Sequence, residues 1–277
     1  MNFSLGFSPC PNDTFIFYAL LHHKVDTKGH VFSPFIADVE ALNQKASESE
    51  LDLTKISYNA YLDLINAYVL LDSGSALGRN CGPLLISKTD LSMQEIRGQR
   101  IAIPGNKTTA NFLLDFYLPF EVKKKVAIFS EIESMISSNT VSAGVIIHEN
   151  RFTYEERGFK LIKDLGSHWE EKSGFPIPLG GIIAKRSIPL QICKEISDII
   201  RSSIEYAYAH QDEVLEYVRR YAQEMEESVM LKHIDLYVND FSLDLGPEGR
   251  SAVLHFIEVA INQNRISTPD SIDPFLS

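Results

Sequence analysis

One histidine directly follows an apolar run that is typical of a buried strand. Residues 144–147 read Gly-Val-Ile-Ile, and His148 comes next. An imidazole has an ordinary pKa of about 6.5, so it suits a general base near neutral pH. The alternative is a hydrogen-bonded histidine at a strand end, and the residues alone leave both open. Neighbouring Glu149 is expected to be solvated, because consecutive strand residues point to opposite faces.

Two threonines stand where a turn leads into a helix. The apolar residues 101–103 predict a strand, residues 104–106 (Pro-Gly-Asn) predict a turn, and a helix is expected to begin near Thr108 and Thr109. The N–H groups of a first helical turn and the positive end of its dipole favour an anion, so this is a candidate seat for a carboxylate or phosphate. The alternative is a threonine cap after an ordinary turn. Lys107 lies at the wrong spacing for a Walker motif.

Polar residues also end a strand nearer the N-terminus. Residues 51–57 predict a strand that ends with Lys55 and Ser57, next to an expected helix start at Tyr58. Open α/β sheets bind ligands at such carboxyl ends of strands. The alternative for Lys55 is a solvated lysine, since most lysines are exposed.

The segment after the first predicted strand combines two prolines with an asparagine and an aspartate. Residues 8–13 read Ser-Pro-Cys-Pro-Asn-Asp. We expect the prolines to prevent helix before Asp13, which would then cap a helix over residues 14–21. Asn12 lies at the same kind of strand end as Lys55, and its alternative is a turn asparagine.

Composition and charge limit the class of protein. The chain has 277 residues, enough for one large or two modest domains, and its formal net charge is −11. Such a charge argues against a nucleic-acid or anionic-membrane partner, because the field of the protein repels polyanions. A small anionic substrate would need local donors. The N-terminus lacks a signal-peptide pattern and no run is long enough for a membrane span, so we expect a cytoplasmic location.

The three cysteines are Cys10, Cys81 and Cys193, and they form no CxxC pair. Their wide separation indicates neither a disulfide framework nor a zinc knuckle. We therefore expect buried or incidental thiols.

The order of the predicted elements indicates two lobes. Strands and helices alternate up to about residue 185. A short connection over residues 92–98, where a capping box is soon ended by Gly98, and the Pro- and Gly-containing stretch 176–184 suit two crossings between lobes. We predict a bilobal α/β fold with a ligand cleft between its lobes; the larger, discontinuous lobe is 1–90 with 182–277, and the smaller, inserted lobe is 91–181. This organisation resembles the type II periplasmic solute-binding proteins, a fold that does not by itself specify a function. Finer expectations are a helix over 58–68, a strand over 126–129 and an exposed loop over 169–174.

Several ordered segments carry a resemblance to a known enzyme family. They are Ser-Pro-Cys-Pro-Asn-Asp-Thr-Phe at 8–15, Asp-Val-Glu-Ala-Leu-Asn at 38–43, Lys-Ile-Ser at 55–57, Ala-Leu-Gly at 76–78 with Cys-Gly-Pro-Leu at 81–84, Ile-Pro-Gly at 103–105 with Thr-Thr-Ala at 108–110, and Gly-Val-Ile-Ile-His-Glu at 144–149. Together and in this order they resemble the 1,4-dihydroxy-6-naphthoate synthases of the futalosine pathway of menaquinone biosynthesis. The resemblance runs from residue 3 to about 185, with weaker motifs beyond. Asn80 stands where the family's loop would have a glycine, and asparagine tolerates a left-handed backbone better than most residues.

The resemblance implies a reaction and roles for particular residues. The reaction is conversion of cyclic dehypoxanthine futalosine to 1,4-dihydroxy-6-naphthoate, with release of the sugar-derived fragment and without a metal or organic cofactor. It implies that His148 is the proton acceptor. Because the substrate carries a carboxylate, the resemblance favours the anion-seat interpretation of the two threonines. It implies substrate contacts by five residues, namely Lys55, Ile56, Ser57, Thr108 and Thr109.

Two other classes of function remain as alternatives. One is the chorismate dehydratase of the same pathway, which would also need an anion-binding cleft, although the strand that delivers His148 disfavours it. The other is a non-catalytic protein that binds or senses a small anion. The expected partner is a small anionic aromatic substrate, with no nucleic acid and no membrane, and a homodimer is an assembly that the sequence leaves open.

Overall fold

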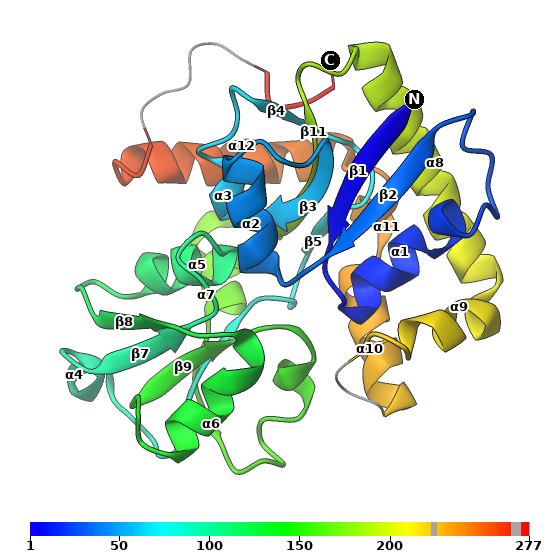
Figure 1. Cartoon of the computed structure of the whole chain (residues 1–277). Helices are drawn as coiled ribbons and strands as arrows, with labels where there is room; N and C mark the ends of the chain where they lie inside the picture. The colour runs from blue at the N-terminus through cyan, green and yellow to red at the C-terminus, as the bar shows by residue number, and fades with distance from the viewer. Residues whose placement is uncertain (223–225, 267–272, 277) are drawn as a thin grey trace. The chain divides into compact units, whose positions relative to one another are not determined.

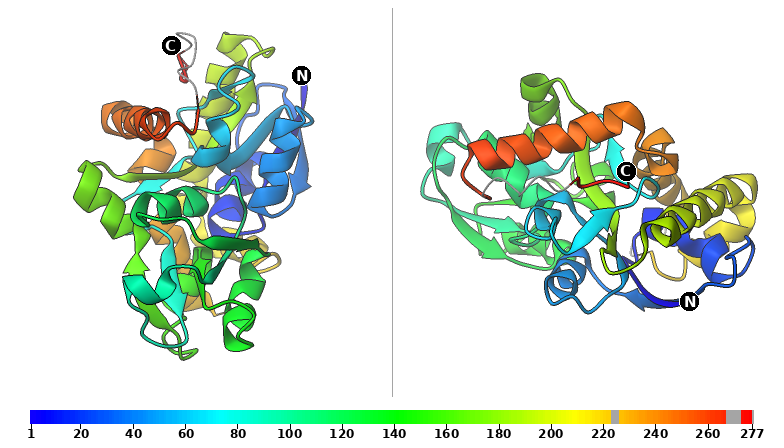
Figure 2. Two further views of the ribbon diagram at one scale, coloured as in Figure 1. Left: turned by 90° about the vertical axis from the view of Figure 1, so that its left-hand side faces the viewer. Right: turned by 90° about the horizontal axis from the view of Figure 1, so that it is seen from above.

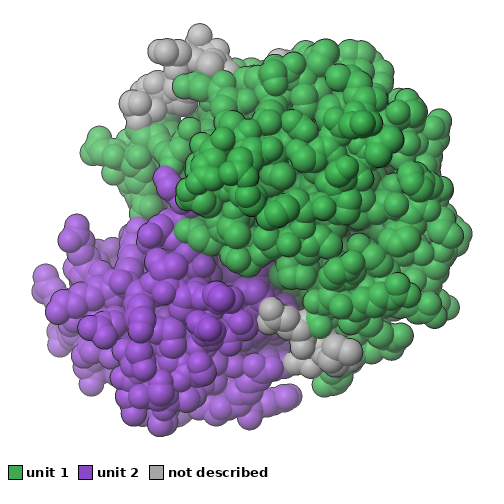
Figure 3. Space-filling model, viewed as in Figure 1, with its two compact units in different colours: residues 1–78, 178–277 green, residues 79–177 purple. Residues whose placement is uncertain are grey.

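The chain divides into two compact units in its computed structural model, which describes residues 1–222, 226–266 and 273–276. The larger unit comprises residues 1–78 and 178–277, and the smaller unit comprises residues 79–177 (Figure 3). Each unit has its own sheet and its own helices, so we describe them one at a time (Figure 1).

The larger unit is built on a mixed sheet with the strand order β2-β1-β3-β11-β4, and β5 pairs with β11. Its strands are β1 (Asn2–Phe7), β2 (Val31–Ile36), β3 (Leu53–Ser57), β4 (Tyr68–Leu70), β5 (Ala76–Gly78) and β11 (Ile177–Lys185). β1 runs parallel to β2 and β3, whereas β11 is antiparallel to β3 and β4. The two neighbouring parallel strands β1 and β3 therefore present their carboxyl ends at one edge of the sheet.

The helices of the larger unit supply most of its core. They are α1 (Pro11–Leu21), α2 (Val39–Ser47), α3 (Tyr58–Tyr61), α8 (Leu190–Ala209), α9 (Gln211–Val218), α10 (Glu227–Tyr237), α11 (Asp240–Leu243) and α12 (Gly246–Asn262). α1 is buried, its residues from Phe15 to Leu20 are apolar, and it packs against α8. Ser203 of α8 connects the two helices, because its hydroxyl donates to the Ile16 carbonyl at 2.6 Å and accepts from the Leu20 N–H at 3.0 Å. Figure 2 shows the long helices α8 and α12 from two further sides.

The smaller unit has a five-stranded sheet with the order β10-β6-β9-β7-β8. Its strands are β6 (Leu84–Ser87), β7 (Arg100–Ile103), β8 (Lys123–Val126), β9 (Ala143–Ile146) and β10 (Lys160–Asp164), and its helical segments are α4 (Met93–Ile96), α5 (Thr109–Tyr117), η1 (Phe129–Glu131), α6 (Ile132–Ser137), η2 (His148–Phe152) and α7 (Leu165–Ser173). β7 runs parallel to β8 and β9, while β6 is antiparallel to β9 and β10. Because β6 pairs with strands of this sheet, the chain has entered the smaller unit before residue 91, where the sequence led us to expect the crossing.

Three expectations about single elements were wrong. The helix expected over 58–68 ends at Tyr61, and Tyr68 instead begins strand β4, which pairs with β11. The strand expected over 126–129 is β8, at Lys123–Val126; it is an edge strand, so its lysine side chains can reach water while its backbone pairs with β7.

The third wrong expectation concerns the only tryptophan. Residues 169–174 were expected to form an exposed loop, but Trp169 lies in helix α7 and is completely buried. Its indole N–H donates to the Pro176 carbonyl at 3.3 Å, and its ring packs against Phe112 and Phe116 of α5. Tertiary packing here outweighs the polar sequence around the tryptophan.

The structure contains, among the residues it describes, no helix with both the length and the apolar character that crossing a lipid bilayer requires.

A glycine in β9 sets how closely α6 approaches the smaller sheet. A Cβ atom at Gly144 would lie 2.4 Å from Cγ2 of Ile132 and 3.1 Å from Cδ1 of Ile136, both on α6. These isoleucines and Ile146 of β9 belong to the core of this unit. The glycine therefore allows α6 to lie directly against the strand that leads to His148.

We expect Gly144→Ala to lower the free energy of unfolding by about 1–3 kcal/mol, because the added methyl group must displace a packed isoleucine. Urea denaturation measures this. Ser134→Ala, on the exposed side of α6, is the matched control and should change stability by less than about 0.5 kcal/mol. Equal stability of the two variants would mean that α6 is not held as closely as described.

Candidate functional site

Two neighbouring parallel strands bring the predicted residues of the smaller unit to the same end of its sheet, where the carboxyl ends of both strands lie. Ile101 of β7 pairs with Ala143 of β9, and Ala102 pairs with Gly144. β7 leads through a turn into α5, and β9 leads into η2. The start of α5 and residue His148 thus follow the carboxyl ends of adjacent strands, which is where α/β sheets place ligand-binding groups.

His148 occupies an unusual backbone conformation. β9 ends at Ile146, and His148 has a φ angle of 59°, in the left-handed region that non-glycine residues rarely adopt. Its ring is half-buried, and an edge-to-face contact joins it to Phe129, with ring centroids 4.9 Å apart. The sequence placed this histidine at the end of the strand, and the structure adds that the chain turns sharply there.

The residues after His148 form the 3-10 turn η2, which is anchored on two sides. Asn150 donates from Nδ2 to Glu133 Oε1 at 3.0 Å, and Arg151 donates to the Gly82 carbonyl. Glu149 is buried, which corrects the expectation that it would be solvated; η2 begins directly after β9, so strand alternation no longer applies.

Thr108 caps helix α5. Its hydroxyl donates to the Gly105 carbonyl at 2.8 Å and accepts from the Asn111 N–H at 3.3 Å. The capping alternative is therefore confirmed for Thr108. It is compatible with an anion seat, because the first-turn N–H groups of a helix point out of its N-terminal end whether or not a side chain caps it. Thr109 is the first residue of the helix and is buried.

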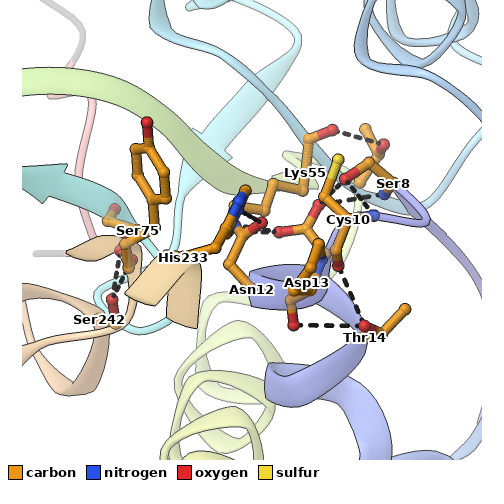
Figure 4. Close-up of polar contacts among 12 residues, drawn as sticks. Ser8, Cys10, Asn12, Asp13, Thr14, Lys55, Ser75, His233 and Ser242 are labelled. Atoms are coloured by element: carbon orange, nitrogen blue, oxygen red, sulfur yellow. Dashed lines mark hydrogen bonds and ion pairs between the residues drawn. The ribbon is translucent and has the colours of Figure 1, made fainter. Parts of the chain in front are cut away.

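A buried carboxylate organises the corresponding edge of the larger unit (Figure 4). Asp13 Oδ2 accepts from the Ser8 N–H at 3.1 Å and from its hydroxyl at 2.6 Å. Asp13 Oδ1 accepts from Asn12 Nδ2 at 2.9 Å and forms an ion pair with Lys55 Nζ at 2.7 Å. Asp13 was expected to cap its helix; instead α1 already begins at Pro11, because proline is tolerated in a first helical turn, and Asp13 lies within that turn.

Lys55 is part of this arrangement and is not solvated. Only 6% of the residue is exposed, and its ammonium group pairs with Asp13. The next residues of β3 are also buried, and the Ser57 N–H donates to Asn43 Oδ1 at 3.0 Å. The backbone carbonyl of Ile56 faces Gly180 of β11, where a Cβ atom would approach it to 2.9 Å.

A histidine that the sequence did not single out completes the chain of hydrogen bonds. His233 of α10 is completely buried, and its Nε2 lies 3.1 Å from Asn12 Oδ1. Asp13 can only accept, so Asn12 must present its NH2 group to Asp13 and its oxygen to His233, which then donates. In sequence, His233 is one of several helical histidines, and no local pattern connects it with Asn12.

The loop residue that departs from the expected family pattern adopts the conformation of a glycine. Asn80 has a φ angle of 56°, and its N–H donates to Glu170 Oε1 at 2.7 Å. Asparagine can replace the glycine at this position because it tolerates a left-handed backbone better than most residues.

Two of the three cysteines are poor candidates for a nucleophile. All three are free and buried. Burial raises the pKa of Cys81 to about 12 and that of Cys193 to about 11, so both are thiols at neutral pH. Taken unit by unit, the described residues hold no set of three His, Cys, Asp or Glu side chains within reach of one metal ion.

Comparison with known proteins identifies relatives over most of the chain. A sequence model of the family described as "Menaquinone biosynthesis" matches residues 3–262. A protein of Thermus thermophilus named "1,4-dihydroxy-6-naphtoate synthase" is 47% identical over 253 residues, which is 90% of each chain. A protein of Streptomyces coelicolor with the same name is 39% identical over 254 residues, covering 90% of this chain and 89% of that one.

Solved structures agree with the fold predicted from the sequence. Protein AF1704 from Archaeoglobus fulgidus superimposes with a TM-score of 0.91 at 32% identity, covering 96% of this chain and 98% of the other. The periplasmic aliphatic sulphonate binding protein SsuA from Escherichia coli gives a TM-score of 0.66 at 10% identity, covering 99% and 90%. The second likeness shows the fold alone. The bilobal α/β, periplasmic-binding-protein-like fold class is thereby confirmed.

The cap of α5 gives a first test of the site. We expect Thr108→Val to lower the free energy of unfolding by about 1 kcal/mol, because the Asn111 N–H and the Gly105 carbonyl lose their shared partner. Thr108→Ser keeps the hydroxyl and should remain close to the wild type. Urea denaturation distinguishes the two, and a valine variant as stable as the serine variant would refute the cap.

The ion pair of the larger unit gives a second test. We expect Asp13→Asn to cost about 3 kcal/mol, because it leaves the buried Lys55 ammonium without a countercharge. Lys55→Met should cost about half as much, because Asp13 keeps three donors and lies in the first turn of α1. The double variant should be more stable than Asp13→Asn alone. Equal losses from the two single variants in urea denaturation would contradict this account.

Proposed function

This chain belongs to the menaquinone biosynthesis family, and on that premise we propose that it is a lyase that converts cyclic dehypoxanthine futalosine to 1,4-dihydroxy-6-naphthoate. The observation that carries the proposal is the likeness, over about nine-tenths of the chain, to two proteins named 1,4-dihydroxy-6-naphtoate synthase. That name describes enzymes, so the chain is an enzyme of this family. Carbon–carbon cleavage as its chemistry is our proposal.

We assign the proton transfer to His148. In its neutral form the imidazole accepts a proton from the ring system of the bicyclic substrate, and the electron pair left behind forms a ring double bond as the carbon–carbon bond to the sugar-derived portion breaks. That bond's electron pair leaves with the sugar-derived fragment, which takes up the proton from the imidazolium, and the remaining ring is aromatic. Aromatisation supplies the driving force, and a positioned base contributes roughly 10²- to 10⁴-fold to the rate. The half-buried ring at the carboxyl end of β9 supports this role, because it is packed on one side and still accessible.

We assign the substrate carboxylate to the start of α5. The single hydroxyl proton of Thr108 is already donated to Gly105, so the seat relies on backbone N–H groups of the first turn and on Thr109. Lys55 is ion-paired with Asp13, so it brings no uncompensated positive charge to an anion. We therefore propose that Lys55, Ile56 and Ser57 contact and orient the substrate, whereas α5 holds its charge.

The distribution of charged residues also supports placing the substrate carboxylate at the start of α5. Lys and Arg nearly balance Asp and Glu over residues 79–177, so the acidic excess of the chain lies in the larger unit. An anion is repelled less by the smaller unit, which carries the proposed seat. No metal or organic cofactor enters the proposed reaction.

We expect wild-type protein to form 1,4-dihydroxy-6-naphthoate from cyclic dehypoxanthine futalosine in the presence of a chelator, and His148→Ala to turn over at least about 10²-fold more slowly. Mass spectrometry of the reaction mixture measures both. The variant should still bind the product, because the carboxylate seat is intact, and calorimetry checks this. Near-normal turnover by His148→Ala would remove the histidine from the mechanism.

The alternatives give different results in the same experiment. A chorismate dehydratase would leave the futalosine derivative unchanged and consume chorismate. A non-catalytic anion-binding protein would bind the aromatic carboxylate and consume neither compound. Either result would overturn the proposed lyase activity.

A further inference from the structure

We propose that Glu133 is a positioning residue for His148: through Asn150 it holds the turn in which the histidine lies. The inference rests on the proposed role of His148 and concerns contacts within the smaller unit only. Neither Glu133 nor Asn150 was a candidate from the sequence, where Glu133 reads as one acidic residue of a short helix.

The two oxygens of Glu133 have different partners. Oε1 accepts from Asn150 Nδ2 at 3.0 Å, and both residues are 7% exposed. Oε2 accepts from an amino group of Arg157 at 2.8 Å, and the side chain of Arg157 is 45% exposed. Exposed ion pairs contribute little, whereas a buried hydrogen bond to a carboxylate is costly to lose. The contact with Asn150 is therefore the one that fixes structure.

Asn150 is the centre of the turn. Its backbone carbonyl accepts from the Thr153 N–H at 3.2 Å and from the Tyr154 N–H at 3.1 Å. Its side chain joins the turn to α6 through Glu133. These contacts fix Asn150 within the 3-10 turn η2, which begins two residues earlier at His148.

The left-handed backbone of His148 needs such support. A histidine at a φ of 59° is in a sparsely populated conformation, and surrounding contacts must hold it there. Phe129, which touches the imidazole, lies in η1, and α6 follows η1 without a break. One continuous segment, residues 129–137, therefore contacts the ring at one end and fixes the turn through Glu133.

The experiment compares three variants that alter the two oxygens of Glu133 separately. Glu133→Met removes both contacts, Glu133→Gln keeps an amide oxygen that can accept from Asn150, and Arg157→Met removes the exposed ion pair while leaving the contact with Asn150. We expect Glu133→Met to lower kcat at least about tenfold with little change in KM, because misplacing a catalytic group slows the chemical step. Glu133→Gln should recover most of kcat, and Arg157→Met should behave as the wild type.

Asn150→Ala provides a second route to the same test if Glu133→Met does not fold. It removes the hydrogen bond from the other end and leaves Glu133 paired with Arg157. It should reproduce the loss in kcat, and combining it with Glu133→Met should add little, because both remove one interaction. Equal losses from Arg157→Met, or full activity of Glu133→Met, would overturn the proposal.

A spectroscopic measurement keeps this proposal separate from the proposed reaction. The ring signals of His148 in ligand-free protein can be assigned by NMR by comparison with His148→Ala. We expect them to shift in Glu133→Met and Asn150→Ala and to stay in place in Glu133→Gln and Arg157→Met. If the wild type proves inactive but the signals follow this pattern, the lyase assignment fails and the positioning role stands. Unmoved signals in Glu133→Met would refute the positioning role whatever the activity.

Discussion

The parallel pairing of β7 with β9 is the constraint on which the smaller unit's site depends. It brings the carboxyl ends of two strands to one sheet edge, so the turn into α5 and the turn at His148 become neighbours although they are far apart in sequence. Gly144 lets α6 lie against β9, and Glu133 of α6 then reaches the turn that follows this strand. The packing of α6, the left-handed backbone at His148 and the proposed proton transfer therefore all depend on this one strand pair.

In the larger unit, a buried carboxylate holds together polar residues that come from separate parts of the sequence. β1 and β3 are parallel neighbours, and Ser8 after β1 and Lys55 within β3 meet at the Asp13 carboxylate. Three hydrogen bonds and the ion pair with Lys55 satisfy this carboxylate, which is why a lysine can lie almost fully buried within β3. The arrangement fixes the position of the Lys55 ammonium and cancels its charge, so its contribution to binding is geometric.

Local sequence patterns predicted those parts of the site that depend on neighbouring residues. The strand before His148, the turn before Thr108 and the left-handed Asn80 follow from periodicity, turn chemistry and backbone preference. Partners far away in the sequence could not be found in this way. We expected Lys55 to be solvated because its countercharge, Asp13, lies far away in the sequence in α1. We expected Trp169 to be exposed because its packing partners belong to α5.

A crystal structure of the protein with 1,4-dihydroxy-6-naphthoate bound would show whether α5 and His148 form the binding site. We expect the carboxylate to lie within hydrogen-bond distance of the first-turn N–H groups of α5 and the naphthalene ring to contact the His148 imidazole. A carboxylate bound instead to the Lys55 ammonium, or a ring remote from His148, would contradict it. Either contradiction would mean that the shared sheet edge of β7 and β9 is not where the chemistry takes place.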